Sequence, residues 1–312
     1  MPSRHSLSFH TTLTVSLMFA LASTSFAQVA GPQLGLIPDG SSLRQVAGIP
    51  AAAAVGAPVS FSRNLSLVNA SSQGFAVATD ADSGLVLIVA PDTSATTLSN
   101  VTLKPDMIQL SPRGSAAALW YISGRHAQIL SGLPSNPSVR DLDLSFISAK
   151  PVALAVSDDG LTVAVEWPGI VYEFTAAGTA GLPVNGGSAA LAFSPGTSDL
   201  AIASPTTATL WNSAGITSLA SFSNPLNPIA AGLDSRRLVI ADSSGTIVTV
   251  NLASGSQSSL DCQCSPAGLY PLNQSAYRLT GLGQGAFKIL DTNQNAIWFA
   301  PLAFSAATGG QQ

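Results

Sequence analysis

A short sequence unit recurs six times along this chain, and this repeat constrains the fold more than any other feature. Each copy has an apolar strand, a small polar turn, and then further apolar strands separated by turns. The first turns of the six copies are residues 69–74, 111–114, 157–160, 194–197, 234–236 and 273–275. Their first residues are 42, 46, 37, 40 and 39 positions apart. A period of about 40 residues with several strands in each copy indicates the blade of a β-propeller.

The segments between the turns have the patterns of strands. In the third copy, Leu161–Glu166 alternates in polarity and is followed, after a Pro-Gly turn, by Ile170–Phe174. In the fifth copy, Arg237–Ala241 and Thr246–Val250 flank a polar turn. These strands are rich in β-branched residues, which pack well on a pleated surface. Many are apolar on both faces, as expected for a sheet that packs between two other sheets.

The N-terminal region adds a hairpin to these six copies. Residues 34–40 and 43–49 resemble the second half of the sixth copy, and we expect segment 28–60 to complete the ring beside the last blade. Such closure protects an open sheet edge. The repeats occupy 61–304, and 305–312 is expected to be a disordered tail. The sequence therefore predicts an all-β protein, a β-propeller with six or seven blades of antiparallel four-stranded sheets.

The turns Ser111–Gly114 and Ser157–Gly160 resemble those of YVTN-type and WD40-like propellers. The resemblance covers residues 60–304 at the level of the repeat. The Trp-Asp pair of true WD40 repeats is absent, because the four tryptophans are followed by Tyr121, Pro168, Asn212 and Phe299. The resemblance implies the fold, but it does not select a function, since propellers include both enzymes and binding scaffolds.

The first 27 residues have the features of a secretory signal peptide. A basic start at Arg4 is followed by the apolar run Leu13–Ala22 and by the small-x-Ala end Ser25–Ala27 before Gln28. The run is short for a bilayer span, although an uncleaved anchor is the alternative. No later segment is long enough to cross a membrane. We therefore expect a secreted or periplasmic protein with no transmembrane segment after signal removal.

The composition argues against a nucleic-acid partner. Charged residues make up only 9% of the chain, and its formal net charge is −4. A nucleic-acid-binding protein needs a basic face to neutralise phosphates. Glycine and proline are abundant, with 27 and 20 residues, as in an all-β protein with many turns.

The two cysteines, Cys262 and Cys264, could form a disulfide in an oxidising compartment. Residues two apart on a strand point the same way, and their Cα atoms lie near the upper distance limit for a relaxed disulfide. Two free thiols at a strand end therefore remain an alternative. Two sulfurs alone do not make a metal site, and we assign no metal-binding or cofactor-binding residue and no cofactor.

No catalytic set can be assigned. His126 is the one histidine left after signal removal, and it lies at an expected hairpin tip with no identifiable triad partners. Glu166 and Glu173 are the only glutamates, and they share one face of a hairpin if Pro168 and Gly169 form its turn. Paired carboxylates could serve glycoside hydrolysis. Nothing in the sequence indicates a cleft, so we expect instead two solvated charges at a blade edge.

The remaining polar motifs have structural explanations. The segment Asp80–Gly84 begins like a calcium loop, but it lacks the distal glutamate and favours a tight turn. Asp141 and Asp143 would share one face of a strand. The four tryptophans are spread over four copies, which is more typical of packing anchors than of a ligand platform.

Two functions are consistent with these features. The first is an exported binding or scaffold module that presents its loops to an unidentified protein or glycan of the envelope or extracellular space. The alternative is an exported propeller hydrolase, either lactonase-like or a glycosidase. The sequence favours the binding module over an enzyme, because it offers no identifiable catalytic residues.

Overall fold

The polar turns of the sequence repeat each join the first two strands of an antiparallel sheet. The structure is a computed structural model, and it describes residues 31–302 apart from 148–149, 168, 185–186, 274 and 284–285. The expected signal peptide and the expected C-terminal tail lie outside the described residues. The described residues belong to one compact unit that begins at Gly31.

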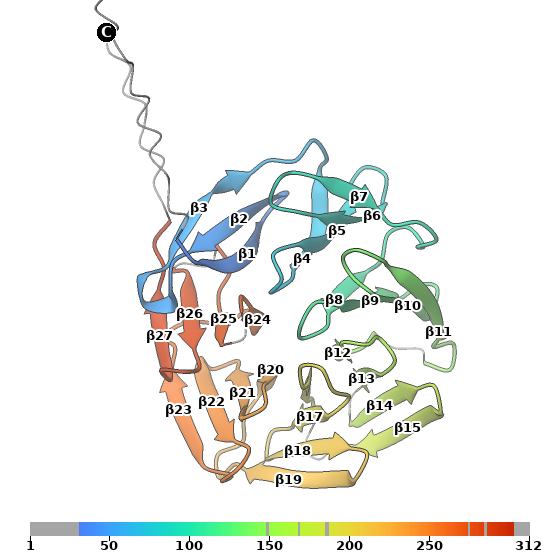
Figure 1. Ribbon diagram of the computed structural model, residues 1–312. Coiled ribbons are helices and arrows are strands. Elements are labelled where there is room, and N and C mark those ends of the chain that lie inside the picture. The colour runs from blue at the N-terminus through green and yellow to red at the C-terminus, as the bar shows by residue number, and fades with distance from the viewer. Residues whose placement is uncertain are drawn as a thin grey trace, which may run out of the picture. The chain divides into compact units, whose positions relative to one another are not determined.

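Seven antiparallel sheets follow one another around a ring in the described part of the chain, and we call them blades 1 to 7 (Figure 1). Blade 1 has three strands, and a short 3-10 helix, η1 (Pro50–Ala52), precedes the third: β1 (Gln33–Asp39), β2 (Ser42–Ala47) and β3 (Ala54–Val59). Blades 2 and 3 have four strands each: β4 (Leu65–Ala70), β5 (Ala76–Asp80), β6 (Val86–Val89), β7 (Ala95–Thr97), then β8 (Met107–Leu110), β9 (Ala116–Tyr121), β10 (His126–Ser131) and β11 (Ser138–Asp143).

Blades 4 to 7 repeat the four-stranded pattern. Blade 4 comprises β12 (Ala153–Val156), β13 (Val163–Trp167), β14 (Ile170–Thr175) and β15 (Gly178–Pro183). Blade 5 comprises β16 (Ala190–Phe193), β17 (Leu200–Ala203), β18 (Thr207–Asn212) and β19 (Gly215–Ser221). Blade 6 comprises β20 (Pro228–Leu233), β21 (Arg237–Asp242), β22 (Thr246–Asn251) and β23 (Gln257–Asp261). Blade 7 comprises β24 (Tyr270–Pro271), β25 (Ala276–Arg278), β26 (Lys288–Asp291) and β27 (Ala296–Phe299).

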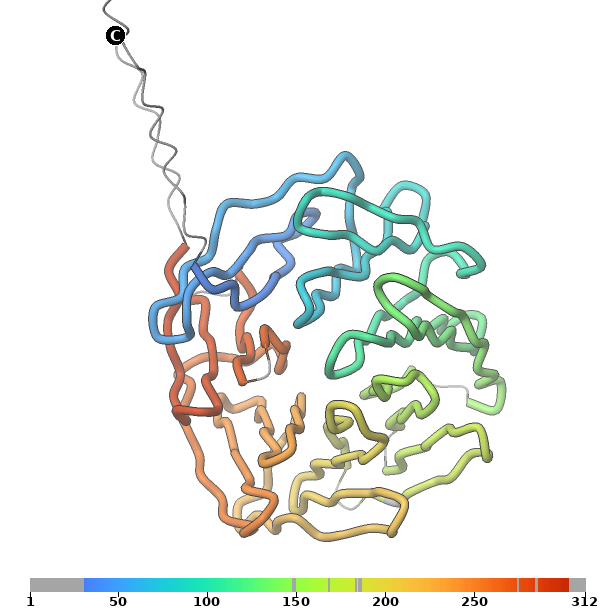
Figure 2. Tube along the Cα trace, viewed as in Figure 1, coloured from blue at the N-terminus to red at the C-terminus, as the bar shows by residue number. Residues whose placement is uncertain are grey.

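These sheets confirm the predicted β-propeller and select seven blades over six. The expected hairpin at the N-terminus is the β1–β2 pair, in which Leu36 lies opposite Gln45 and Asp39 opposite Ser42. Blade 1 differs from the four-stranded prediction in having three strands. A parallel bridge between Val55 and Leu302 lies at its outer edge, where the N–H of Val55 donates to the carbonyl of Pro301 at 3.0 Å. The chain that leaves blade 7 thus pairs with blade 1, as the adjacent blue and red segments of Figure 2 show.

Apolar side chains on both faces of the strands hold neighbouring blades together. Among the described residues, seven buried clusters each join two successive blades around the ring. On β10, Ile129 packs in the cluster shared with blade 4, and the next residue, Leu130, packs in the cluster shared with blade 2. Because successive side chains of a strand point to opposite faces, apolar residues are favoured on both faces of a strand between two blades. This explains the apolar runs of the repeat.

The expected packing role of the tryptophans is seen at one of these interfaces. Trp120 of blade 3 and Trp167 of blade 4 are buried with their ring centroids 5.9 Å apart. The small residues Ala116, Ala117 and Ala118 on β9 have no exposed surface. No helix in the described residues is long and apolar enough to cross a membrane.

Candidate binding site at the centre of the ring

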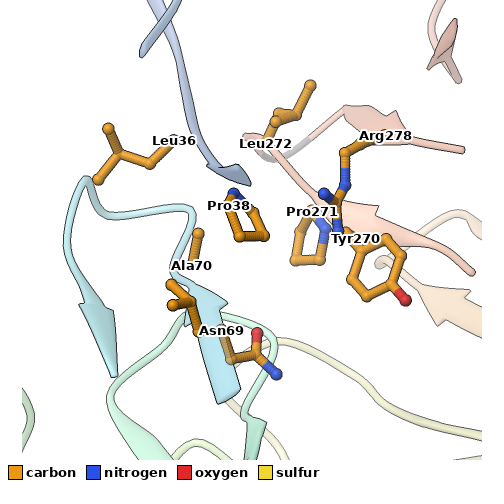
Figure 3. Close-up of a pocket in the computed structure, with 9 residues that line it drawn as sticks. Leu36, Pro38, Asn69, Ala70, Tyr270, Pro271, Leu272 and Arg278 are labelled. Carbon is orange, nitrogen blue, oxygen red and sulfur yellow. The ribbon is translucent and has the colours of Figure 1, made fainter. Parts of the chain in front are cut away.

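Three first strands lead to a common pocket near the centre of the ring. In Figure 1 the first strands of the blades lie nearest that centre, and β1, β4 and β24 belong to blades 1, 2 and 7. The pocket has a volume of about 40 Å³ and lies where these strands run into their polar turns (Figure 3). It is lined by Leu36, Pro38, Val68, Asn69, Ala70, Tyr270, Pro271, Leu272 and Arg278.

Arg278 is the one charged residue in this lining. It lies on β25 directly opposite Tyr270 of β24, and only 7% of its surface is exposed. Its guanidinium carbon is 4.0 Å from the centroid of the Tyr270 ring, so one face of the cation lies on the ring. This contact compensates part of the lost hydration. Burial lowers the pKa of Arg278 from its ordinary value, because the charged form is poorly solvated there.

The guanidinium has no carboxylate partner in the described part of the chain. The ion pairs found there join Arg44 to Asp39, Arg63 to Asp80 and Arg113 to Asp158. The Nε atom of Arg278 is buried and has no hydrogen-bond partner. Buried polar groups in folded proteins are nearly always hydrogen-bonded, and buried charges are nearly always paired. The site is therefore a buried cation whose hydrogen-bonding capacity is not used within the described chain.

Strand alternation directs Arg278 toward the pocket. The preceding residue, Tyr277, points to the opposite face of blade 7 and packs with Val239 and Ala241 of blade 6. Burial raises the pKa of Tyr277 to about 12. Ala276, two residues before Arg278, packs in the cluster that joins blade 7 to blade 1. The side of β25 that carries Arg278 therefore faces blade 1.

The other polar groups of the pocket are held by the protein itself. The side-chain amide of Asn69 donates to the carbonyl of Ile108 at 2.8 Å. The hydroxyl of Tyr270 donates to the carbonyl of Ala267 at 3.1 Å, which fixes the ring under the guanidinium. Figure 3 shows Arg278 beside Pro271 and the Tyr270 ring, with Pro38 and Asn69 on the other side. Chemically, the pocket is a fixed positive charge with mainly apolar walls.

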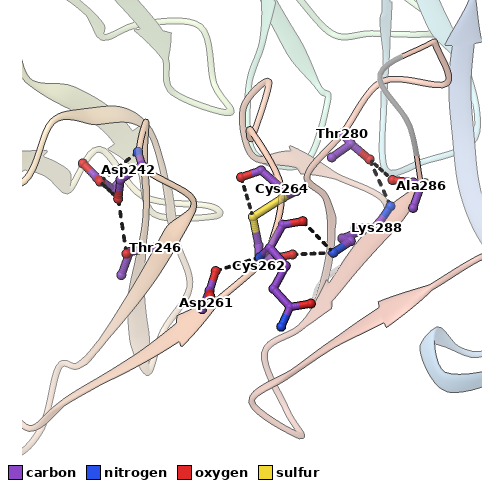
Figure 4. The surroundings of a disulfide bond; sticks show 10 residues. Asp242, Thr246, Asp261, Cys262, Cys264, Thr280, Ala286 and Lys288 are labelled. Atoms are coloured by element: carbon purple, nitrogen blue, oxygen red, sulfur yellow. Dashed lines mark hydrogen bonds between the residues drawn. A yellow bond between two sulfur atoms is a disulfide. The ribbon is translucent and has the colours of Figure 1, made fainter.

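The two cysteines lie elsewhere, in the segment between β23 and β24, and line no part of this pocket. A disulfide joins Cys262 to Cys264, with an S–S distance of 2.04 Å (Figure 4). The intervening Gln263 has φ of +46°, and its N–H donates to the carboxylate of Asp261 at 2.7 Å. The ammonium of Lys288 donates to the carbonyls of Cys262 and Gln263 at 2.5 and 3.1 Å. The disulfide thus closes a small ring that Lys288 ties to blade 7.

The strand register places the two glutamates on one face of a hairpin, as predicted. Glu166 lies opposite Val171, and Glu173 lies opposite Ala164. The expectation of two solvated charges is wrong for Glu166, which has no exposed surface because this face packs against blade 5. Its Oε1 accepts the N–H of Ala189 at 3.0 Å, and its Oε2 is buried without a partner. Burial raises the pKa of Glu166 to about 7, against the opposing effect of that hydrogen bond, and burial also raises the pKa of Glu173.

The other predicted polar residues occupy turns and strands. His126 begins β10 directly after the turn that follows β9, and its ring stacks on Tyr121 with centroids 4.6 Å apart. Asp80 accepts the N–H groups of Asp82 and Ser83 at 3.0 and 3.3 Å, which confirms the predicted tight turn. The hydrogen bond from Arg63 lowers the pKa of Asp80.

Two further residues, Asp141 and Asp143, lie on β11 as expected, and the amide of Gln128 donates to Asp141 at 2.9 Å. No group of three or more His, Cys, Asp or Glu that could hold a metal ion occurs among the described residues.

Sequence reasoning did not identify Arg278 or the pocket around it. The sequence does contain one signal, because Arg278 interrupts the otherwise apolar segment Ala276–Leu279 in a chain with few charges. Five of the residues that line the pocket with it come from β1 and β4, which are more than 200 positions earlier in the chain. Their proximity follows from closure of the ring and not from any local pattern.

The comparison with known proteins supports the fold alone. No protein-family model and no curated protein sequence matches the chain. A streptogramin B lyase structure is similar with a TM-score of 0.56 and 13% identity, over 87% of this chain and 89% of that chain. The structure of apo AztD from Citrobacter koseri is similar with a TM-score of 0.52 and 14% identity, over 85% of this chain and 94% of that chain. A chain of a mitotic checkpoint complex is similar with a TM-score of 0.51 and 14% identity, over 75% of this chain and 78% of that chain.

Proposed function

We propose that this chain is an exported β-propeller that binds a partner through the pocket formed by blades 1, 2 and 7. The observation that carries the proposal is the guanidinium of Arg278, which is buried beside the pocket and has no carboxylate partner among the described residues. An unpaired buried charge costs several kcal/mol of effective desolvation. A partner that supplies hydrogen-bond acceptors to this group recovers interactions that the free protein lacks.

The size of the pocket limits how a partner uses it. A volume of about 40 Å³ admits a few waters or one small functional group, and it is far smaller than the 300–1,000 Å³ typical of pockets for drug-sized ligands. Only the tip of a partner enters, and the surrounding turns contact the remainder. This arrangement supports a protein or glycan partner bound at one end of the ring. Export rests on the signal-peptide features of residues 1–27.

The geometry gives less support to an exported hydrolase. The glycosidase version needs two carboxylates that flank a substrate. Glu166 instead faces blade 5 with no exposed surface. Its burial between two packed blades favours a structural role over contact with substrate.

Site-directed photo-crosslinking in the source organism tests this proposal. A photoreactive residue at Val68, which lines the pocket, is expected to crosslink one discrete partner to the mature chain. The matched control carries the same residue at Thr96, an exposed position on β7 at the outer edge of blade 2. The N-terminus of the crosslinked chain is expected to be Gln28. Identical products from both positions would contradict binding at the pocket, and retention of residues 1–27 on a cell-internal chain would contradict export.

A further inference from the structure

We infer that the group bound beside Arg278 is a single carboxylate attached to an aliphatic carbon. This inference rests on the proposed function, and it specifies the chemistry that the pocket recognises. It follows from the charge, the hydrogen-bonding geometry, the volume and the walls of the pocket.

The charge of the pocket selects a monoanion. Arg278 is the one charged residue among the nine that line it, so the pocket offers one positive charge. A carboxylate balances this charge, whereas a phosphate monoester carries up to two negative charges and would retain one unpaired in a largely apolar environment. A neutral sugar hydroxyl would leave the cation uncompensated.

The orientation of Arg278 leaves the edge of its guanidinium group to bind a planar hydrogen-bond acceptor. Tyr270 covers one face of the guanidinium at 4.0 Å, and the N–H groups of a guanidinium project in the plane, away from that face. Nε is one of these donors, and it is buried without a hydrogen-bond partner among the residues that the structure describes. A guanidinium edge and a carboxylate form two parallel hydrogen bonds, which is the geometry in which arginine is most selective.

The pocket volume and walls define what the carboxylate is attached to. A water needs about 10–15 Å³ by the same measure, so about 40 Å³ suits a group of three heavy atoms. The walls around it are aliphatic and include Leu36, Pro38, Val68 and Leu272. They favour a methylene or methine carbon next to the carboxylate over a further polar group. Both a free short-chain carboxylate and a carboxylate at the tip of a protein chain have this chemistry.

A binding experiment distinguishes these sources. The folded mature protein is titrated by calorimetry with sodium propionate, with propionamide, and with a tripeptide that ends in valine as either the free acid or the amide, all at equal ionic strength. We expect the acids to bind and both amides to fail. Binding by the tripeptide acid, with or without propionate, identifies a chain end as the source. Binding by propionate alone identifies a free carboxylate. Failure of both acids would overturn the inference.

Variants of the pocket tie the binding to Arg278. Arg278→Met should weaken acid binding about tenfold or more, since hydrogen bonds to a charged group are lost. Arg236→Met is the matched control, because Arg236 is exposed in the blade 6 turn and should bind as wild type does. If Arg278→Met does not fold, Ala70→Leu tests the same site by filling the pocket with the cation kept. Undiminished binding by a folded pocket variant would overturn the inference.

Failure of this inference differs from failure of the proposed function. If inorganic phosphate binds more tightly than propionate, and only when Arg278 is present, the inference of a carboxylate ligand is wrong. The proposed function is then retained, with a different anion bound at the pocket. If carboxylates bind but no pocket-specific crosslink forms at Val68, this inference is retained and the proposal of a macromolecular partner is wrong.

Discussion

At the scale of single residues, two buried ionisable groups in the described part of the chain each have an atom without a hydrogen-bond partner. Arg278 has an unpartnered Nε atom beside the central pocket, and Glu166 has an unpartnered Oε2 atom between blades 4 and 5. The pocket gives Arg278 access to a ligand, whereas Glu166 is enclosed by packed strands. An unpartnered buried polar atom therefore has different consequences in different surroundings. Beside the pocket, Arg278 favours ligand binding, whereas Glu166 between packed strands makes the stability depend on pH.

For Glu166 we predict a loss of stability as the pH rises. Its pKa in the folded protein is about 7, above the ordinary value of 4.5, so the folded state binds more protons than the unfolded state between these values. The free energy of unfolding therefore falls through this interval, by up to about 3 kcal/mol from this group, and levels off above it. Glu166→Gln removes the titration and should flatten this part of the profile, as measured by urea unfolding from about pH 4 to about pH 8.

A second variant provides the comparison. Glu173 shares the face of Glu166 but is half-buried, and Glu173→Gln should change the slope less. An unchanged pH profile in Glu166→Gln would show that the buried carboxyl does not control this part of the stability curve.

At the scale of elements, the first turns of neighbouring blades are tied together by one carboxylate. Asp158, in the turn of blade 4, accepts the N–H of Arg113 from blade 3 at 2.8 Å and the N–H of Gly196 from blade 5 at 2.7 Å. We predict that Asp158→Ala lowers the free energy of unfolding by about 1–2 kcal/mol, because two backbone donors lose a charged acceptor near the surface. Chemical denaturation measures this loss.

The control for Asp158 is another acidic turn residue. Asp82→Ala removes an exposed carboxylate and should change stability by less than about 0.5 kcal/mol. Equal losses of stability from the two substitutions would mean that the hydrogen bonds between turns contribute nothing beyond the effect of removing a surface charge.

The difference between what sequence could and could not predict is clearest at this scale. The turns at 111–114 and 157–160 were predictable because serine, aspartate and glycine act locally. The same-face placement of Glu166 and Glu173 was predictable because a two-residue turn fixes the register of a hairpin. Their burial was not, since it depends on blade 5. The pocket around Arg278 was not predictable either, because three blades from opposite ends of the chain form it.

At the scale of the whole molecule, closure of the ring and the central pocket depend on the same contact. Blades 1 and 7 share an apolar cluster that includes Leu34, Ile37 and Phe287. Leu36 of blade 1 and Leu272 of blade 7 both line the pocket. Gly35 directly precedes Leu36 on β1, and a Cβ added to it would be 2.7 Å from the carbonyl oxygen of Leu272. The close approach of the first and last blades therefore requires glycine at this position.

We accordingly predict that Gly35→Ala destabilises the protein and weakens binding at the pocket. The φ of Gly35 is +158°, a conformation that L side chains rarely adopt, so the backbone conformation and the contact with Leu272 both oppose an added Cβ. Backbone cannot yield as a flexible side chain does, and overpacking of this kind costs about 1–3 kcal/mol. Gly31→Ala is the control, since an added Cβ there meets nothing within 4 Å. Urea unfolding measures the first effect and propionate titration the second. If Gly35→Ala matched Gly31→Ala in both, the pocket would not depend on the spacing between blades 1 and 7.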